Sequence, residues 1–384
     1  KKLLSKYWGQ YTALGDTFLE NLQGLTTLKI YQADERRQEE MNREAENFRK
    51  ITMKVLTMQL NSITIMDLMA YGGAALGGIL AVRQFLNGEI LLSECLFIIL
   101  LAADFFLPMR LLGSFFHIAM NGMAASDKIF KLLDLPEPVK GTKEISQESG
   151  LCCRDLTFAY EKERPILKQI SLSAKKGDFV AIVGESGCGK STLASIFTGK
   201  NRNYQGEVLF GGAQGVPLAE ISEESLLEQI TYVGHAGYLF RGTVRENLLL
   251  AKPDGTDEEF WQVLEQMKLA DFLRSEQGLD TMLAEKGSNF SGGQCQRLVM
   301  ARALLHDSAV YIFDEATSNI DAESENDIME QIYQMKGKKT VLLISHRLAN
   351  VTAADKIYVL EQGKIAEQGN HETLITQNGS YAKL

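Results

Sequence analysis

The chain has 384 residues, more than one compact domain usually holds, so two structural units are expected. Acidic residues outnumber basic ones 49 to 40, and the net charge of −9 without any basic stripe argues against nucleic acid as the main partner. The five cysteines have neither metal-ligand nor disulfide-framework spacing, which argues against a zinc site and against a secreted disulfide scaffold.

The first 55 residues are polar, with apolar side chains at helical spacing, and they predict helices with a bend at Gly24. Taken alone, this segment would equally fit an amphipathic helix pair of a soluble protein. The chain starts at Lys1, and its opening stretch lacks the apolar core and cleavage site of a signal peptide. We therefore expect an N-terminal truncation.

Two apolar segments follow, at about residues 60–82 and 90–109, and each is close to the length that crosses about 30 Å of hydrocarbon. Glycine and alanine crowd the middle of the first segment, as in membrane helices that pack closely. Basic residues lie beyond both outer ends, which predicts a multi-pass protein of the cell membrane with both ends in the cytoplasm. Asp67 and Asp104 would be costly in lipid unless they line a pathway or form interhelical hydrogen bonds, and both interpretations remain open.

A change of composition then separates two regions. Residues 135–149 are rich in proline, glycine, serine and charge, and we interpret them as a linker. From residue 150 to 384, short β-type runs alternate with helical patterns, which is typical of an α/β domain on a largely parallel sheet. The sequence thus predicts an all-α transmembrane helical region over residues 1–134, followed by an α/β domain over residues 150–384.

A glycine-rich segment follows the first apolar strand of this domain. Residues 178–183 read DFVAIV and run into GESGCGKST at 184–192, with a helical pattern after it, which is a P-loop in its required context. Its backbone N–H groups would face phosphate oxygens, Lys190 could reach the β- and γ-phosphates, and Ser191 could ligate Mg²⁺. The candidate nucleotide-binding residues of this α/β P-loop NTPase are Gly184, Glu185, Ser186, Gly187, Cys188, Gly189, Lys190, Ser191 and Thr192.

A second apolar strand, residues 309–313, ends in Asp314 and Glu315 and fits the Walker B pattern. Asp314 would hold Mg²⁺, and Glu315 would orient and polarise the water that attacks the γ-phosphate. The alternative is a strand that merely ends in surface acids.

Residues 290–294 read FSGGQ and resemble the LSGGQ signature of the ATP-binding cassette family, with Phe in place of the leading Leu. The resemblance implies that this segment binds ATP held by a second cassette, so catalysis needs a dimer with a second half-transporter. The residues that it assigns to this role are Ser291, Gly292, Gly293 and Gln294.

The resemblance also assigns single residues elsewhere. It implies that Tyr160 stacks on adenine, although a core strand aromatic is the alternative, and that His346 is the switch histidine at the γ-phosphate. Residues 318–321 resemble the D-loop at the dimer interface. Residues 285–287 resemble the exporter-specific segment that touches the coupling helices of the membrane domain.

One motif departs from the family. Where the Q-loop usually has Val-Pro-Gln, this chain has Val233, Gly234 and His235. His235 could still present a ring nitrogen to Mg²⁺ or water, with a different reach, donor pattern and pH response. The candidate catalytic residues are therefore Glu315, His346 and His235, and the candidate metal ligands are Ser191, Asp314 and His235.

The order of spans, linker and cassette resembles exporter-type ABC half-transporters. It implies an ATPase subunit that uses ATP and Mg²⁺ to export a small-molecule or peptide cargo across membrane lipid, with its cassette in the cytoplasm. More specifically, residues 15–20 (GDTFLE) and 29–35 (KIYQADE) are similar to heterodimeric bacterial half-transporters of the thiol-exporting type used in cytochrome bd assembly.

Two other functions remain open at this point. One is a regulatory, weakly hydrolysing half of a heterodimeric exporter, and the other is a soluble ABC ATPase without a transport role. The sequence decides neither the cargo, nor homodimer against heterodimer, nor the effect of His235, nor the identity of the missing N-terminal spans.

Overall fold

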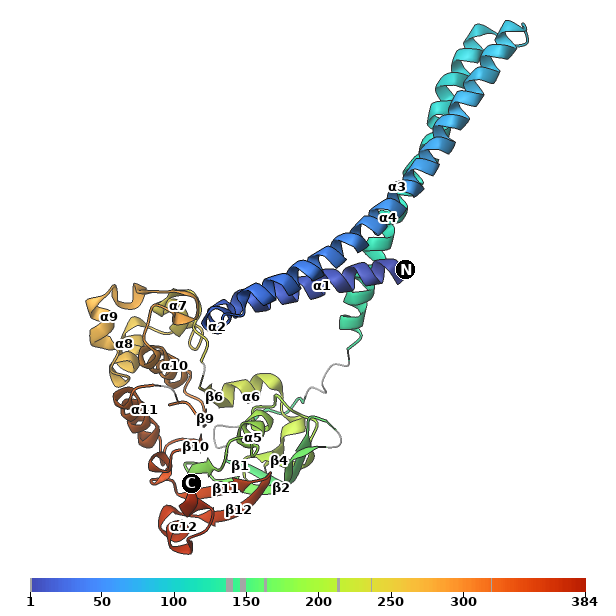
Figure 1. Ribbon diagram of the computed structural model, residues 1–384. Helices are drawn as coiled ribbons and strands as arrows, with labels where there is room; N and C mark the ends of the chain where they lie inside the picture. Colours follow the sequence, from blue (N-terminus) through green and yellow to red (C-terminus); the bar gives the residue numbers. More distant parts are fainter. Residues whose placement is uncertain are drawn as a thin grey trace. The chain divides into compact units, whose positions relative to one another are not determined.

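The computed structural model describes residues 2–135, 141–145, 150–161, 164–212, 215–235, 237–318 and 320–384. The chain divides into two compact units, Lys1–Glu137 and Pro138–Leu384, which are described separately here (Figure 1). Of the expected linker, residues 136–140 and 146–149 lie outside the described residues.

The first unit is entirely helical in its described part. Its helices are α1 (Lys2–Gln23), α2 (Leu25–Ile30), α3 (Asp34–Leu86) and α4 (Leu92–Leu133). The bend expected at Gly24 is confirmed, because α1 ends just before this glycine and α2 begins just after it. A short turn joins α3 to α4, and the two helices run side by side as a hairpin (Figure 1).

Both apolar segments lie inside much longer helices, so the helices extend beyond the expected membrane spans, and the limits of the spans stay a prediction. α3 has 53 residues and α4 has 42, and α4 continues through Pro108 without ending. The charged residues before the first segment and after the second are good helix formers, so hydrogen bonding continues along them. Among the described residues, α3 has the length and composition to cross a membrane, and Leu92–Ala102 is a shorter apolar stretch.

Small residues let α3 and α4 approach each other. A Cβ atom at Gly77 would lie 3.9 Å from Cβ of Ala102, and one at Gly78 would lie 3.8 Å from Cγ1 of Ile99. Large apolar side chains point away from this contact, and Leu68 and Ile79 are 73% and 65% exposed. An apolar exterior of this extent suits lipid or further helices better than water.

The second unit is built on a six-stranded sheet in the order β12-β11-β3-β10-β9-β6, in which β12 alone is antiparallel. A four-stranded antiparallel sheet, β2-β1-β4-β5, and a two-stranded sheet, β7-β8, accompany it. The strands are β1 (Leu151–Ala159), β2 (Pro165–Ala174), β3 (Phe179–Val183), β4 (Gln205–Phe210), β5 (Val216–Pro217), β6 (Ile230–Gly234), β7 (Gly242–Thr243), β8 (Met282–Leu283), β9 (Val310–Asp314), β10 (Thr340–Ile344), β11 (Lys356–Glu361) and β12 (Lys364–Gly369). The largely parallel sheet expected from the sequence is confirmed.

Both faces of the six-stranded sheet are buried, which explains why its central strands read as unbroken apolar runs. On β9, Tyr311 and Phe313 belong to one core cluster, while Val310 and Ile312 belong to the other. The first cluster includes side chains of α8, α10 and α11, and the second includes side chains of α5 and the antiparallel sheet. The helices of this unit are α5 (Lys190–Phe197), α6 (Glu223–Gln229), α7 (Val244–Leu249), α8 (Asp257–Gln266), α9 (Ala270–Ser275), α10 (Gly292–His306), α11 (Ala322–Gln334) and α12 (His371–Gln377).

Strand register brings the motifs to one edge. Ile344, the last residue of β10, pairs with Ile182 of β3 on one side and with Asp314 of β9 on the other. Asp314 in turn pairs with Gly234 at the end of β6. Because these strands are parallel, the segments that follow them emerge at the same carboxyl edge, where ligands of such sheets usually bind.

We predict that Ile312→Ala lowers the free energy of unfolding by about 2 to 5 kcal/mol, because it leaves a cavity between the sheet and its helices. Ile375, which is 44% exposed on α12, provides the matched control. Ile375→Ala should change stability by less than about 0.5 kcal/mol. Urea unfolding followed by tryptophan fluorescence measures both, and equal losses would contradict the central position of β9.

Candidate nucleotide-binding site

The loop between β3 and α5 needs glycine at two positions. Gly184 and Gly189 have φ angles of +147° and +110°, which side chains rarely adopt. A Cβ atom at Gly184 would collide with the carbonyl oxygen of Leu360, and one at Gly189 would lie 2.7 Å from Cδ2 of Leu167. The two glycines therefore allow the loop to curve and to end at the N-terminus of α5. A loop of this kind at a helix N-terminus favours the binding of a phosphate.

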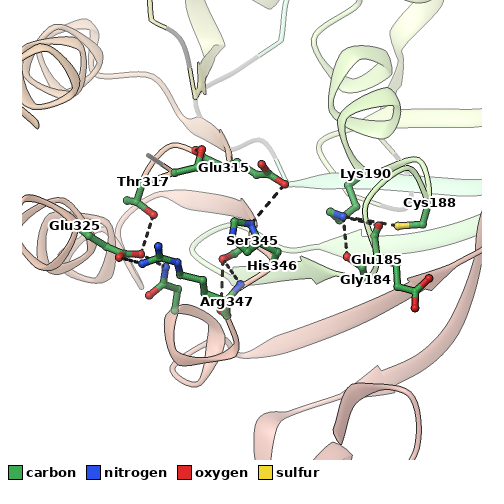
Figure 2. Close-up of polar contacts among 12 residues, drawn as sticks. Gly184, Glu185, Cys188, Lys190, Glu315, Thr317, Glu325, Ser345, His346 and Arg347 are labelled. Atoms are coloured by element: carbon green, nitrogen blue, oxygen red, sulfur yellow. Dashed lines mark hydrogen bonds and ion pairs between the residues drawn. The ribbon is translucent and has the colours of Figure 1, made fainter. Parts of the chain in front are cut away.

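Lys190 lies inside this curve and is only 6% exposed. Its Nζ donates hydrogen bonds to the carbonyl oxygens of Gly184 at 2.8 Å and Glu185 at 2.9 Å, and it lies 3.9 Å from Sγ of Cys188 (Figure 2). A buried ammonium held only by neutral groups can gain a strong charge-assisted bond from a phosphate oxygen. Around it, Ser186, Gly187 and Ser191 are exposed and Thr192 is half-buried, so the loop is open to a ligand.

Tyr160 lies beside this loop. This residue is 61% exposed, so it is not a core aromatic, and its ring packs edge-on against that of Phe158, with 4.9 Å between the ring centroids. A cavity of about 720 Å³ is lined by Tyr160 together with Gly187 and Cys188 of the P-loop. The structure thus places an accessible aromatic face next to the candidate phosphate site, as stacking on a nucleotide base requires.

Asp314 is the buried acid of the site, at 5% exposure. Its Oδ2 accepts a hydrogen bond of 3.0 Å from the hydroxyl of Tyr232, and its Oδ1 is buried without a hydrogen-bond partner among the described residues. Burial and the nearby carboxylate raise the pKa of Tyr232, so this hydroxyl stays protonated and remains a donor. An unpaired buried carboxylate oxygen is costly, and a cation removes that cost, so Asp314 fits Mg²⁺.

Glu315 and His346 lie together at the same edge (Figure 2). Glu315 has a φ angle of +51°, and its N–H donates to the carbonyl oxygen of Ile344 at 3.0 Å. Its Oε1 lies 3.7 Å from Nδ1 of His346, and both side chains are partly exposed. The unusual backbone conformation turns the carboxylate away from the strand and toward the histidine, where a water could lie between it and a phosphate.

His235 is placed differently from the other candidates. It follows β6 and is exposed, and its ring makes no hydrogen bond with any residue that the structure describes. The strand pairing nevertheless puts its neighbour Gly234 opposite Asp314.

The signature segment caps its own helix. Ser291 accepts a hydrogen bond from the N–H of Gln294 at 3.2 Å, and Oε1 of Gln294 accepts one from the N–H of Ser291 at 2.8 Å. Gly293 is required by close packing, because a Cβ atom there would lie 2.8 Å from Oδ1 of Asp321. Ser291 and Gly292 are exposed, and no hydrogen bond among the described residues joins this segment to the P-loop.

Glu325, on α11, was missed by the sequence reasoning. This 6% exposed carboxylate accepts hydrogen bonds from Thr317 at 3.2 Å and Asn350 at 2.9 Å, and it forms an ion pair with Arg347 (Figure 2). It therefore fixes the segment after Glu315 and the residue after His346 to the same helix. The arginine next to the histidine was a signal, since a cation so near a buried core needs an acid.

Gln296 and Tyr232 were missed as well. The side-chain amide of Gln296, on the signature helix α10, donates to the carbonyl oxygen of Gly234 at 3.2 Å. No pattern in the sequence points to either contact, because each joins segments that are more than 60 residues apart.

We predict that Lys190→Ala lowers the affinity for ATP about 10- to 100-fold, because a hydrogen bond to a charged group contributes about 1.5 to 3 kcal/mol. Calorimetric titration with ATP measures the change. Lys338→Ala, which removes an exposed lysine after α11, is the control and should leave the affinity unchanged. Equal affinity of the Lys190 variant and the unaltered chain would contradict the phosphate role.

Comparisons with known proteins show which family the chain resembles. The family model described as ABC transporter matches residues 167–318. An uncharacterized ABC transporter ATP-binding protein of Haemophilus influenzae is 52% identical over 387 residues, which cover all of this chain and 69% of that protein. ATP-dependent lipid A-core flippases of Vibrio parahaemolyticus and Haemophilus ducreyi are 33% and 40% identical, over 100% and 72% of this chain and 66% and 48% of their own lengths.

A solved structure extends the similarity to the whole fold. The structure of a bacterial Atm1-family ABC exporter with ATP bound matches all of this chain and 67% of its own, with a TM-score of 0.88 and 26% identity. The chain thus spans between about half and two thirds of the length of these relatives. It belongs to the ABC transporter family, and it combines the ATP-binding domain of that family with the fold of an exporter subunit.

Proposed function

We propose that this chain works as one half of a dimeric exporter of a cell membrane, in which Mg²⁺-dependent ATP hydrolysis drives a cargo across the bilayer. The observation that carries the proposal is the meeting of Lys190, Asp314 and the Glu315–His346 pair at one edge of the sheet. In this proposal residues 1–134 are the end of a multi-pass membrane domain, 135–149 are a linker, and 150–384 are the cassette in the cytoplasm.

The residues of the edge have separate tasks in hydrolysis. Lys190 and the P-loop N–H groups hold the β- and γ-phosphates, and Tyr160 stacks on the adenine. Asp314 and the hydroxyl of Ser191 would hold Mg²⁺, which neutralises charge on the phosphate oxygens when it is bound. His235 is exposed, so we assign it at most an indirect, water-mediated part in this ligand set.

The chemical step is an in-line displacement. Glu315 orients a water whose oxygen forms a bond to the γ-phosphorus, while the bond from that phosphorus to the β–γ bridging oxygen breaks and releases ADP. His346 contacts the γ-phosphate and, at 3.7 Å from Glu315, also keeps that carboxylate in place. The proton of the attacking water leaves with the phosphate or through Glu315.

A second cassette completes the site. Ser291, Gly292, Gly293 and Gln294 form the turn at the N-terminus of α10, where the exposed Ser291 and Gly292 suit a phosphate that belongs to another subunit. Half-transporters of this family work as dimers, and we propose that the partner is a second half-transporter, either a copy of this chain or a similar chain.

The cargo is best sought among amphiphiles. The flippase of Vibrio parahaemolyticus matches this chain over its whole length, the helical unit included, and its name gives lipid A-core as the substrate. The exposed apolar side chains of α3 and α4 would suit a cargo that moves within lipid. A small thiol is the second candidate, favoured by the similarity of residues 15–35 to thiol-exporting half-transporters. The same apolar surface argues against a soluble ABC ATPase.

We predict that Glu315→Gln keeps ATP binding and slows turnover by about 100-fold or more, because the phosphate and metal ligands stay while the water loses its polarising carboxylate. Phosphate release from the purified transporter in lipid measures turnover, and Glu372→Gln on α12 is the control. Turnover that is low before substitution and unchanged after it would instead support the regulatory, weakly hydrolysing subunit.

We predict further that lipid A-core raises the ATPase rate of the full-length transporter in lipid vesicles, whereas glutathione and cysteine do not. The rate is measured with the subunit alone and with a similar half-transporter added. Stimulation by the thiols alone would favour the thiol-exporting function. Stimulation by neither would refute both cargo proposals and leave the ATPase assignment intact.

A further inference from the structure

A tyrosine that the sequence motifs leave without a role contacts the buried acid of the site. Tyr232 lies on β6, which pairs with β9 in parallel register, so that Tyr232 is opposite Ile312 and Gly234 is opposite Asp314. Its hydroxyl reaches diagonally across the pair and donates to Oδ2 of Asp314 at 3.0 Å. Tyr232 is 48% exposed, so core packing does not account for its position.

This hydrogen bond makes the two oxygens of Asp314 unequal. Oδ2 is held by Tyr232, whereas Oδ1 is buried and has no hydrogen-bond partner in the described part of the chain. A carboxylate attached at one oxygen cannot rotate freely, so the direction of its other oxygen is fixed as well. Partners of this kind commonly set how strongly a carboxylate binds a metal ion.

Gly234 provides the room for this contact. A Cβ atom there would lie 3.1 Å from the hydroxyl oxygen of Tyr232 and 3.2 Å from Cε1 of its ring. Both distances are shorter than ordinary contacts, so a side chain at this position would require the half-exposed ring to shift by a few tenths of an ångström. The glycine stands where the ATP-binding cassette family usually has proline, so this departure has a direct structural effect besides the change to His235.

We propose that Tyr232 is a positioning residue that holds Oδ2 of Asp314 and thereby presents Oδ1 to the divalent cation. The inference rests on the proposed function, because it assumes that Asp314 serves a Mg²⁺–nucleotide site. Tyr232 itself contacts neither nucleotide nor metal in this role, and Gly234 is the residue that permits it.

The test measures metal binding rather than turnover. Mn²⁺ replaces Mg²⁺, and its binding to the full-length transporter with a non-hydrolysable ATP analogue is followed by electron paramagnetic resonance. Tyr232→Phe should weaken Mn²⁺ binding about 10- to 100-fold, the usual effect of losing a partner of a metal ligand. Binding of the analogue with EDTA present should not change, which shows that the variant is folded.

Two further variants separate the explanations. Tyr238→Phe removes a hydroxyl from a tyrosine of equal exposure, 47%, six residues later, and should leave the Mn²⁺ affinity as it is. Gly234→Ala keeps the Tyr232 hydroxyl but displaces its ring, so it should weaken Mn²⁺ binding in the same direction and by less.

Each result has one meaning. Unchanged or tighter Mn²⁺ binding in Tyr232→Phe overturns the inference while the proposed function stands. A transporter that binds no Mn²⁺ with the analogue even before substitution contradicts the proposed function itself.

Discussion

The in-register parallel pairing of β3, β10, β9 and β6 is the constraint on which the rest of the cassette depends. Ile182, Ile344, Asp314 and Gly234 are matched across these strands, so four chain segments leave the sheet at one level. A shift of one residue would turn Asp314 toward the opposite face and bury it among the apolar side chains around Phe313. Fully buried side chains on both faces resist such a shift.

Among the residues that the structure describes, four charged side chains are buried, and they differ in their partners. Asp327 forms ion pairs with Lys268 and Arg297. Lys190 is held by neutral carbonyl groups, Glu325 has an arginine and two further donors, and Asp314 has a single hydroxyl. Glu325 is well compensated and so stabilises the fold of the loops around it. Lys190 and Asp314 lack a charged partner among the contacts that the structure describes, and a phosphate and a cation supply opposite charges to them. Buried charges that have a partner of opposite charge within the chain thus maintain the structure, and those that lack one are the candidates for binding ligand.

The parts that the sequence predicts are those encoded by adjacent residues. The P-loop, the Walker B strand and the signature turn are contiguous, and glycine spacing, apolar runs and a helix cap are enough to place them. The alternating elements also predict the parallel sheet. The tasks assigned to Tyr160, His346 and His235 remain predictions.

What the sequence does not show depends on pairing between distant segments. Tyr232 meets Asp314 only because β6 lies next to β9, and Glu325 meets Asn350 only because a helix packs beside a turn 25 residues later. The helices extend beyond the apolar segments for another reason. Apolar content marks the part of α3 that prefers lipid, whereas backbone hydrogen bonding continues wherever residues favour a helix, so the two boundaries need not coincide.

The length of α3 has a mechanical consequence. At about 1.5 Å per residue its 53 residues form a rod roughly 80 Å long, more than twice the thickness of the hydrocarbon layer. α3 contains no proline that would kink it. Close to its C-terminal end, Gly77 and Gly78 pack closely against α4. A tilt of about 5° at one end of such a rod displaces the other by roughly 7 Å. A stiff helix of this length therefore converts a small rotation at one end into a displacement at the other end that is comparable to the length of a side chain.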